Sequence, residues 1–288
     1  QTLFFTEMWE RMSYYGMRAL LVLFMTASLQ EGGLAITVAS ATAIYGLYTG
    51  AVYFMGLPGG WIADRLLGGQ RATWYGGIII MLGHIVLAIP SEAGFFVGMI
   101  LVVLGTGLLK PNITAMVGQL YSSDDDRRDG GYTLYYMGIN IGSIIGYFVT
   151  GYLMENAGYH WGFGAAAVGM AFGLIQYKLT QRKLNGVGEK PPKPMSPKGT
   201  KRSWGIIWLL LAGLAVYTYL ALNDYVTIDP TVVAGNVAII FTVIFFVYYL
   251  SVFIFGKLTR DEMKRLGALF LVCIASTMFW AGFEQAGS

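Results

Sequence analysis

Charged residues are scarce in this sequence, histidine is rare and cysteine is almost absent. Charged residues make up 12% of its 288 positions and hydrophobic residues 56%, and the mean hydropathy is +0.58. A soluble domain of this length needs more polar surface to cover itself. The single cysteine, Cys273, excludes a disulfide within the chain. The sequence also lacks spaced histidine ligands, a nucleophile elbow and a phosphate-binding loop, which argues against an enzyme.

Long hydrophobic runs are what the sequence has in abundance. A membrane-spanning helix needs roughly 20 apolar residues, and no run resembles a signal peptide with a small-residue cleavage site. We therefore expect an all-α polytopic membrane protein. Its predicted spans are 4–29, 38–63, 72–90, 94–121, 131–154, 162–179, 204–222, 231–255 and 266–288.

The basic residues of the connections fall on alternate sides of these spans. Lys and Arg are absent from the connections that carry Glu31, Glu92, Glu155, Asp224 and Asp229. The positive-inside rule then predicts that the amino terminus and the even-numbered connections are cytoplasmic. The basic residues of those connections are Arg65, Arg71, Arg127, Arg128, Arg182, Lys183, Lys190, Lys193, Lys198, Lys201, Arg202, Lys257, Arg260, Lys264 and Arg265.

The first span carries both signs of charge. On a helix its ionisable and tyrosine residues fall within an arc of roughly 140°, and these are Glu7, Glu10, Arg11, Tyr14, Tyr15 and Arg18. Charges that only snorkel into headgroups account for Glu7, but Arg18 lies far from either interface. We expect this face to line a water-filled cavity, where ionisable residues mark a substrate or proton path.

Other polar residues inside spans point to the same use. Lys110 precedes Pro111 in "GTGLLKPNITAM", where a kink and a counter-charge are expected; a purely structural ion pair is the alternative. Asn140 is either interhelical glue or a ligand contact. Glu284 in "FWAGFEQAGS" is either a proton switch or half of a static salt bridge. The two histidines are poor candidates, so any proton coupling should run on carboxylates.

Five motifs carry a resemblance to a known family. "GGWIADRLLGGQR" (59–71) looks like the loop between the second and third helices of the major facilitator superfamily. "EMWERMSYYGMR" is similar to the ExxER motif of proton-dependent oligopeptide transporters. "GTGLLKPNI", "YYMGINIGS" and "FWAGFEQAG" resemble that family's fourth, fifth and seventh helices. A departure is Met12, where the family usually has Phe.

The resemblance implies a major facilitator fold of two six-helix bundles, with two further helices inserted between them in bacterial members. Residues 1–183 would be the N-terminal bundle, 184–203 a solvated cytoplasmic linker and 204–256 the inserted helices. Residues 257–288 would hold a connector and the first helix of the second bundle. Because this last helix has polar groups and no later helix to meet them, we expect the chain to be a fragment of a longer protein.

The resemblance also implies roles for single residues. Glu7, Glu10, Arg11 and Glu284 would couple protons, and Arg18 would pair with Glu284 at the extracellular gate. Asp64 and Arg65 would stabilise one conformation by charge pairing between helix ends. Substrate contacts would come from Arg11, Arg18, Tyr14, Tyr15, Tyr53, Lys110, Asn140, Trp280 and Glu284.

The implied function is proton-coupled symport of di- and tripeptides across the cell (inner) membrane by alternating access. A peptide zwitterion needs a cation for its carboxylate, an anion for its amine and tolerant aromatic walls. The expected partners are peptides, protons and the lipid bilayer, with no nucleic acid, no metal and no cofactor besides the coupling proton. The alternative is a facilitator of nitrate or another small anion, with Arg11 and Lys110 as ligands.

Overall fold

The computed structural model describes residues 1–122 and 125–285, and the side chains of 283–285 are outside the described part. Helices cover all of the predicted spans within that part, which contains no strand. The helices are α1 (Thr2–Thr26), α2 (Val38–Phe54), α3 (Gly56–Ile62), α4 (Gly69–Leu87), α5 (Glu92–Gln119), α6 (Arg127–Ala157), α7 (Tyr159–Thr180), α8 (Pro197–Leu222), α9 (Pro230–Phe255) and α10 (Arg260–Gln285). The prediction of an all-α chain is confirmed.

Length and composition separate these helices into two groups. Within the described residues, six segments are long and apolar enough to cross a membrane: Val38–Leu67, Glu92–Gln119, Arg127–Ala157, Pro197–Leu222, Pro230–Phe255 and Arg260–Gly282. The helices α1, α4 and α7 fall outside this group and pack inside the bundle described next. A helix shielded by protein needs less hydrophobic surface than one that faces lipid.

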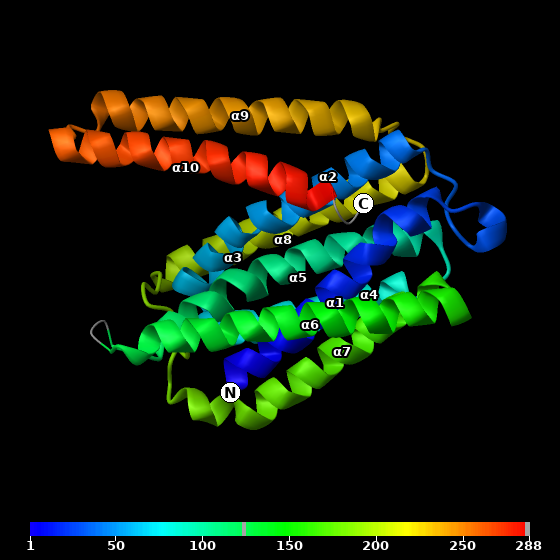
Figure 1. Ribbon diagram of the computed structural model, residues 1–288, viewed down its shortest axis with the longest axis horizontal. Coiled ribbons are helices and arrows are strands. Elements are labelled where there is room, and N and C mark those ends of the chain that lie inside the picture. Colours follow the sequence, from blue (N-terminus) through cyan, green and yellow to red (C-terminus); the bar gives the residue numbers. More distant parts are fainter. Residues whose placement is uncertain (123–124, 286–288) are drawn as a thin grey trace. The chain divides into compact units, whose positions relative to one another are not determined.

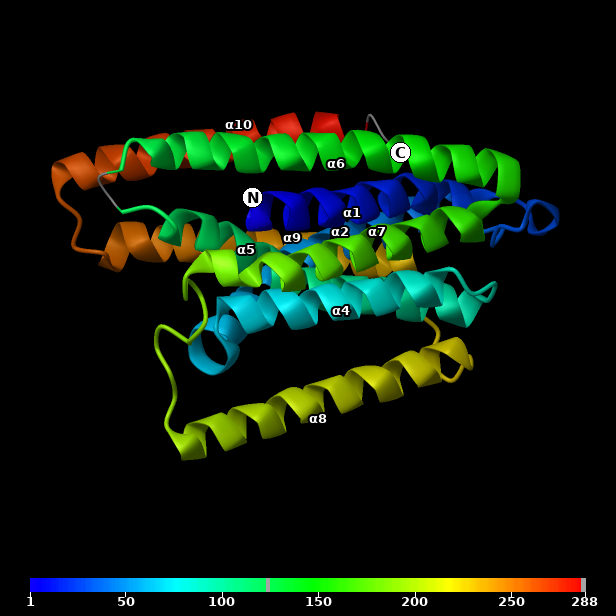
Figure 2. The same ribbon diagram turned by 90° about the horizontal axis from the view of Figure 1, so that it is seen from below.

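The chain forms two compact units, residues 1–37 with 48–228 and residues 38–47 with 229–288. In the first unit α1 packs against α6 and α7, α4 packs against α5 and α7, and α3 lies on α5. Figures 1 and 2 both show α1 alongside α6 and α7. The helix α1 is therefore covered by neighbours along much of its length.

Glycine lets these helices approach closely. A Cβ built on Gly142 or Gly146 of α6 would lie 2.1 and 2.5 Å from the carbonyl oxygens of Met8 and Met12 on α1. Between α4 and α5, a Cβ on Gly76 would lie 2.7 Å from the carbonyl oxygen of Gly105. Small residues at such contacts bring backbones together, which is how helices associate within a membrane. This packing orients α1 so that its opposite, charged face points toward α5.

The second predicted span is broken rather than continuous. The helix α2 ends at Phe54 and α3 begins at Gly56, and a π-helical turn, η2 (Ala63–Leu67), follows. Gly68 then reverses the chain with φ 81°, a left-handed conformation that a side chain disfavours. A Cβ there would also lie 2.8 Å from the carbonyl oxygen of Glu189. The turn before α4 is thus shaped to receive a segment far along the sequence.

That segment is the connection after α7, which we expected to be a solvated linker. Its side chains from 185 to 200 are exposed or half-buried, but its backbone bonds to the bundle. A 3₁₀ turn, η3 (Gln181–Leu184), buries Leu184. The Gln70 amide N–H donates to the Gly188 carbonyl oxygen at 2.8 Å, and Gln70 Nε2 donates to the Val187 carbonyl oxygen at 2.7 Å. Because buried backbone groups must be paired, these bonds fix the linker to the turn before α4. Its composition, rich in Pro and Lys, gave no sign of this.

The linker continues along the π-helical turn. The amide N–H of Lys193 donates to the carbonyl oxygen of Asp64 at 3.1 Å, and that of Met195 donates to the carbonyl oxygen of Arg65 at 3.4 Å. Carbonyl groups at the end of a helix lack partners within the helix, and the linker supplies them here. Ser196 then caps α8 by accepting a hydrogen bond from the Gly199 amide.

The helices beyond the linker have few buried residues. Among the described side chains of α8 only Ser203 is buried, and α9 has none. In the second unit, the Tyr249 hydroxyl of α9 donates to the Leu266 carbonyl oxygen, and Phe245 stacks on Phe270 of α10 with ring centroids 6.2 Å apart. Apolar side chains left on the outside of such helices suit a surface that faces lipid.

Candidate functional site

The charged face of α1 holds a buried ion cluster made of Glu7, Glu10, Arg11 and Lys110. Glu7 and Glu10 are 0% and 1% exposed, and Arg11 is 6% exposed. The guanidinium of Arg11 donates to both carboxylate oxygens of Glu10, and its Nε lies 3.3 Å from Glu7 Oε1 one turn away. We expected this face to line a water-filled cavity, but these three residues are enclosed by protein instead.

Lys110 completes the ion cluster from α5. Its ammonium donates to Glu7 Oε1, so this oxygen receives both cations. The side chain of Lys110 is 33% exposed and is the most accessible member of the cluster. With two carboxylates and two cations the cluster is neutral, which offsets the large penalty of placing isolated charges inside a protein. Lys110 therefore has the counter-charge that the sequence indicated it needs.

The proline beside Lys110 shapes this part of α5 without ending the helix. Pro111 cannot donate a backbone hydrogen bond, which removes the partner of the Gly107 carbonyl one turn earlier. That carbonyl lies against Gly59 of α3, where a Cβ would be only 1.9 Å from its oxygen. Asn112 Nδ2 donates to the Leu108 carbonyl oxygen at 2.6 Å. The side chain of Asn112 thus supports the helix where proline interrupts its bonding.

Tyrosines surround the ion cluster. The Arg11 guanidinium carbon lies 4.5 Å from the ring centroid of Tyr14, which is 4% exposed, and such contacts stabilise a buried cation. Lys110 Nζ lies 5.8 Å from the ring centroid of Tyr135, whose hydroxyl is 3.0 Å from Thr114 Oγ1. Sequence reasoning missed Tyr135 and Thr114, although Tyr135 lies next to the "YMGIN" segment and Thr114 is one turn after Lys110.

The two oxygens of Glu7 are in different situations. Oε1 receives Lys110 and Arg11, whereas Oε2 is buried and has no hydrogen-bond partner among the described residues. A buried polar atom without a partner is uncommon and calls for an explanation. An added proton would remove the charge on this carboxylate and weaken its hold on Lys110. The geometry thus links a proton on Glu7 to the freedom of a cation that is partly accessible.

The remaining predicted residues are not part of the ion cluster. The Arg18 guanidinium carbon lies 6.0 Å from the Tyr15 ring centroid, two turns beyond Arg11. Tyr53 and Asn140 are exposed within their unit. The side chain of Glu284 lies outside the described residues, so its pairing with Arg18 stays a prediction, as does the contact of Trp280 with substrate.

Asp64 and Arg65 contribute their backbone to the packing of the linker. Both side chains are exposed, and neither forms an ion pair within the part of the chain that the structure describes. Their predicted charge pairing between helix ends is therefore not tested. In the same described residues no group of His, Cys, Asp and Glu is arranged to hold a metal ion.

Comparison with known proteins places the chain among membrane transporters. A model of the POT family matches residues 70–288. A peptide transporter of Yersinia enterocolitica is 38% identical over 293 residues, which cover 98% of this chain and 57% of that protein. A di-/tripeptide transporter of Lactococcus lactis is 40% identical and is aligned over 100% of this chain and 59% of its own length. The chain thus spans somewhat more than half the length of these curated relatives.

Solved structures agree with these relatives. A peptide transporter in complex with sulfate is 42% identical, with a TM-score of 0.88 over 99% of this chain and 58% of that one. A POT family transporter in complex with 5-aminolevulinic acid is 35% identical, with a TM-score of 0.89 over 99% and 59%. These likenesses confirm the predicted facilitator fold, and the family is one of transporters and not of enzymes. The chain belongs to the POT family.

Proposed function

We infer that the protein is a symporter that moves di- and tripeptides together with protons across a membrane by alternating access. The observation that carries this inference is the ion pair of Lys110 with Glu7, because it joins a cation suited to a peptide carboxylate to a group that binds a proton. The names of the relatives, peptide and di-/tripeptide transporters, support the same substrate class.

The proposed cycle uses the neutrality of the ion cluster. Protonation of Glu7 leaves Lys110 without its counter-charge, and the carboxylate of an incoming peptide then replaces it. Arg11 stays bound to Glu10 and holds α1 in place, while Tyr14 covers its guanidinium. When the proton leaves, Glu7 takes Lys110 back and the peptide loses its partner. Binding of proton and peptide thereby becomes mutually favourable, which is what coupling between two sites requires.

The remaining assignments follow from sequence and family. The basic connections support a cytoplasmic amino terminus, and a multi-pass protein of a bacterial type would lie in the cell (inner) membrane. We keep residues 1–183, 184–203, 204–256 and 257–288 as bundle, linker, inserted helices and start of the second bundle. Asn140, Tyr15, Tyr53 and Trp280 are proposed to contact the peptide, and Arg18 to pair with Glu284.

Uptake into proteoliposomes tests the proposal. A labelled dipeptide should accumulate only when an inward proton gradient is imposed, and unlabelled di- and tripeptides should compete for uptake where nitrate does not. Competition by nitrate together with failure of peptides to compete would favour the anion facilitator. Equal uptake with and without the gradient would remove proton coupling from the proposal.

Glu284→Gln separates coupling from binding. If Glu284 releases and rebinds a proton against Arg18, the amide imitates a carboxyl group that is always protonated. Gradient-driven accumulation should then be lost, whereas counterflow, the exchange of labelled for unlabelled peptide, should continue. Retained accumulation would mean that the proton travels through another carboxylate, and Glu7 and Glu10 are the next candidates.

A further inference from the structure

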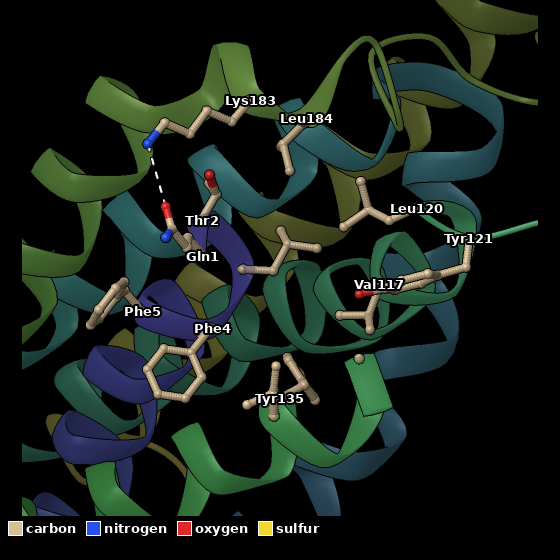
Figure 3. Close-up of a pocket in the computed structure, with 13 residues that line it drawn as sticks. Gln1, Thr2, Phe4, Phe5, Val117, Leu120, Tyr121, Tyr135, Lys183 and Leu184 are labelled. Atoms are coloured by element: carbon tan, nitrogen blue, oxygen red, sulfur yellow. Dashed lines mark hydrogen bonds between the residues drawn. The ribbon is translucent and has the colours of Figure 1, made fainter. Parts of the chain in front are cut away.

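A cavity of about 470 Å³ lies within the first unit, at the end of the bundle that holds Gln1. It is lined by residues of α1, the end of α5, the start of α6 and the η3 turn. Figure 3 shows Phe4, Val117 and Tyr135 around it, and the exposed Lys183 with its bond to the Gln1 side chain. This volume is large enough for several water molecules, whose share of liquid volume is about 30 Å³ each.

The cavity ends close to the buried ion cluster. Leu3, which lines it, is one helical turn before Glu7, and Val117 is two turns after Lys110. At 1.5 Å per residue these separations are roughly 6 and 10 Å along the helices. Tyr135 belongs to both regions, because it lines the cavity and its ring lies 5.8 Å from Lys110 Nζ. Tyr135 therefore stands between the ion pair and the cavity.

The Tyr135 hydroxyl can act as a hydrogen-bond donor or as an acceptor toward its neighbours Thr114 and Glu7. Thr114 Oγ1 can donate to the Lys110 carbonyl oxygen at 3.0 Å. Its hydroxyl also lies 3.0 Å from that of Tyr135, and either group can be the donor in this contact. The Tyr135 hydroxyl also lies beside Glu7, where it can donate to the charged carboxylate or accept a hydrogen bond from the protonated one. A proton on the unpartnered Glu7 Oε2 would have an acceptor in Tyr135.

We propose that this cavity is the route by which the proton held at Glu7 leaves for the water at this end of the bundle, with Tyr135 as its inner gate. The inference rests on the proposed proton coupling. In the release step the O–H bond of the protonated Glu7 breaks and a cavity water takes the proton as hydronium. The electron pair stays on Glu7, and the carboxylate pairs again with Lys110.

Charged groups lie at both ends of the route. At the inner end, Glu10 and Arg11 on α1 neutralise each other, and Lys110 on α5 is the cation that pairs with the Glu7 carboxylate. At the outer end the exposed Lys183 is a cation, which lowers the local concentration of hydronium within a screening distance of about 10 Å. At the same end of the elements that line the cavity, the other charged groups of the described residues are Arg127, Arg128, Asp129 and Arg182, and the other tyrosines are Tyr121, Tyr132 and Tyr136.

A larger side chain placed in the cavity tests the route, and the test uses the full-length protein. Leu120 lines the cavity and is 41% exposed, and Leu82 of α4 is 46% exposed and away from it. Leu120→Trp should slow peptide-dependent acidification of the vesicle lumen, because the larger side chain takes the space of the water that would accept the proton. Its counterflow should stay at the unmodified rate, and Leu82→Trp should match the unmodified protein in both assays.

A second pair of variants tests the gate. Tyr135→Phe keeps the ring and removes the hydroxyl, whereas Tyr152→Phe makes the same change at an exposed position of α6. Only the first should reduce lumen acidification and leave counterflow intact. Acidification at unmodified rates in both Leu120→Trp and Tyr135→Phe would overturn the route, and so would equal loss of counterflow in these variants. If the unmodified protein shows neither uptake nor counterflow, it is the proposed transport function that fails.

Discussion

The helices α1 and α9 have 25 and 26 residues but opposite surroundings within their units. Four ionisable residues lie on α1, and it buries Glu7, Glu10 and Arg11 together with much of its apolar surface. The helix α9 has the highest hydropathy among the candidate spans and no buried residue in the described structure. In water the apolar helix would be the one inside. In a bilayer apolar side chains suit the lipid, and ionisable groups must be enclosed and paired.

The largest effect should come from removing a cation from the ion cluster. Lys110→Ala should abolish gradient-driven peptide uptake, because Glu7 loses a partner and the peptide carboxylate loses its proposed ligand. The matched control is Lys178→Ala, since Lys178 is exposed and its ammonium lies 5.2 Å from the ring centroid of Trp74. The control should transport normally. Uptake by Lys110→Ala at the unmodified rate would remove Lys110 from the site.

A pair of glycine substitutions compares the packing around α1, which Gly146 of α6 contacts, with the packing around α9. Gly146→Ala should destabilise the protein by about 1–3 kcal/mol, because its Cβ would lie 2.5 Å from the Met12 carbonyl oxygen on α1. Gly235→Ala on α9 should change the free energy of unfolding by less than about 1 kcal/mol, since a Cβ there meets no atom of the described residues within 4 Å. Thermal unfolding in detergent measures both, and equal midpoints would contradict the difference in packing.

Asp64 offers a charge outside the buried ion cluster. If it stabilises one conformation by charge pairing between helix ends, Asp64→Asn should change the turnover rate more than the apparent affinity for peptide. Asp261→Asn is the control, because Asp261 is exposed and its only ion-pair partner in the described chain is Lys264, at 3.6 Å on the same helix. Initial uptake rates over a range of peptide concentrations separate the two parameters. A defect confined to affinity would count against the proposed role.

The smallest effect is expected from Asp125, a partly exposed carboxylate whose salt bridge is made with the exposed Arg127. The Arg127 side chain, bonded to Asp125 at 2.8 Å, lowers the pKa of this carboxyl to about 2. A lowered pKa stabilises the folded state above the ordinary value of 3.8, and the contribution is lost as pH falls toward 2. Asp125→Asn should therefore shift the unfolding midpoint slightly at pH 7 and less at pH 3. A shift as large as that of Gly146→Ala would be unexpected for an exposed pair.

Residue patterns alone predicted the helices, because runs of apolar residues long enough to cross a bilayer leave few other structures open to the backbone. The charged face of α1 and the need of Lys110 for a counter-charge were also readable, since charge inside a span is costly wherever it occurs. Resemblance added the family, the substrate class and the roles of Glu7, Glu10 and Arg11. These inferences depend on composition and order along the chain, and not on which helices meet.

Tertiary structure decided everything that depends on contact between distant residues. It paired Lys110 with Glu7 and placed Tyr135 and Thr114 beside this ion pair. It also buried Glu7, Glu10 and Arg11, which we expected to line a water-filled cavity. It also bound the Pro- and Lys-rich linker after α7 to the turn before α4. The linker contributes backbone carbonyl groups to these hydrogen bonds, so its side-chain pattern does not predict them. Periodicity along one helix shows which residues share a face. Only the packing of helices determines what that face meets.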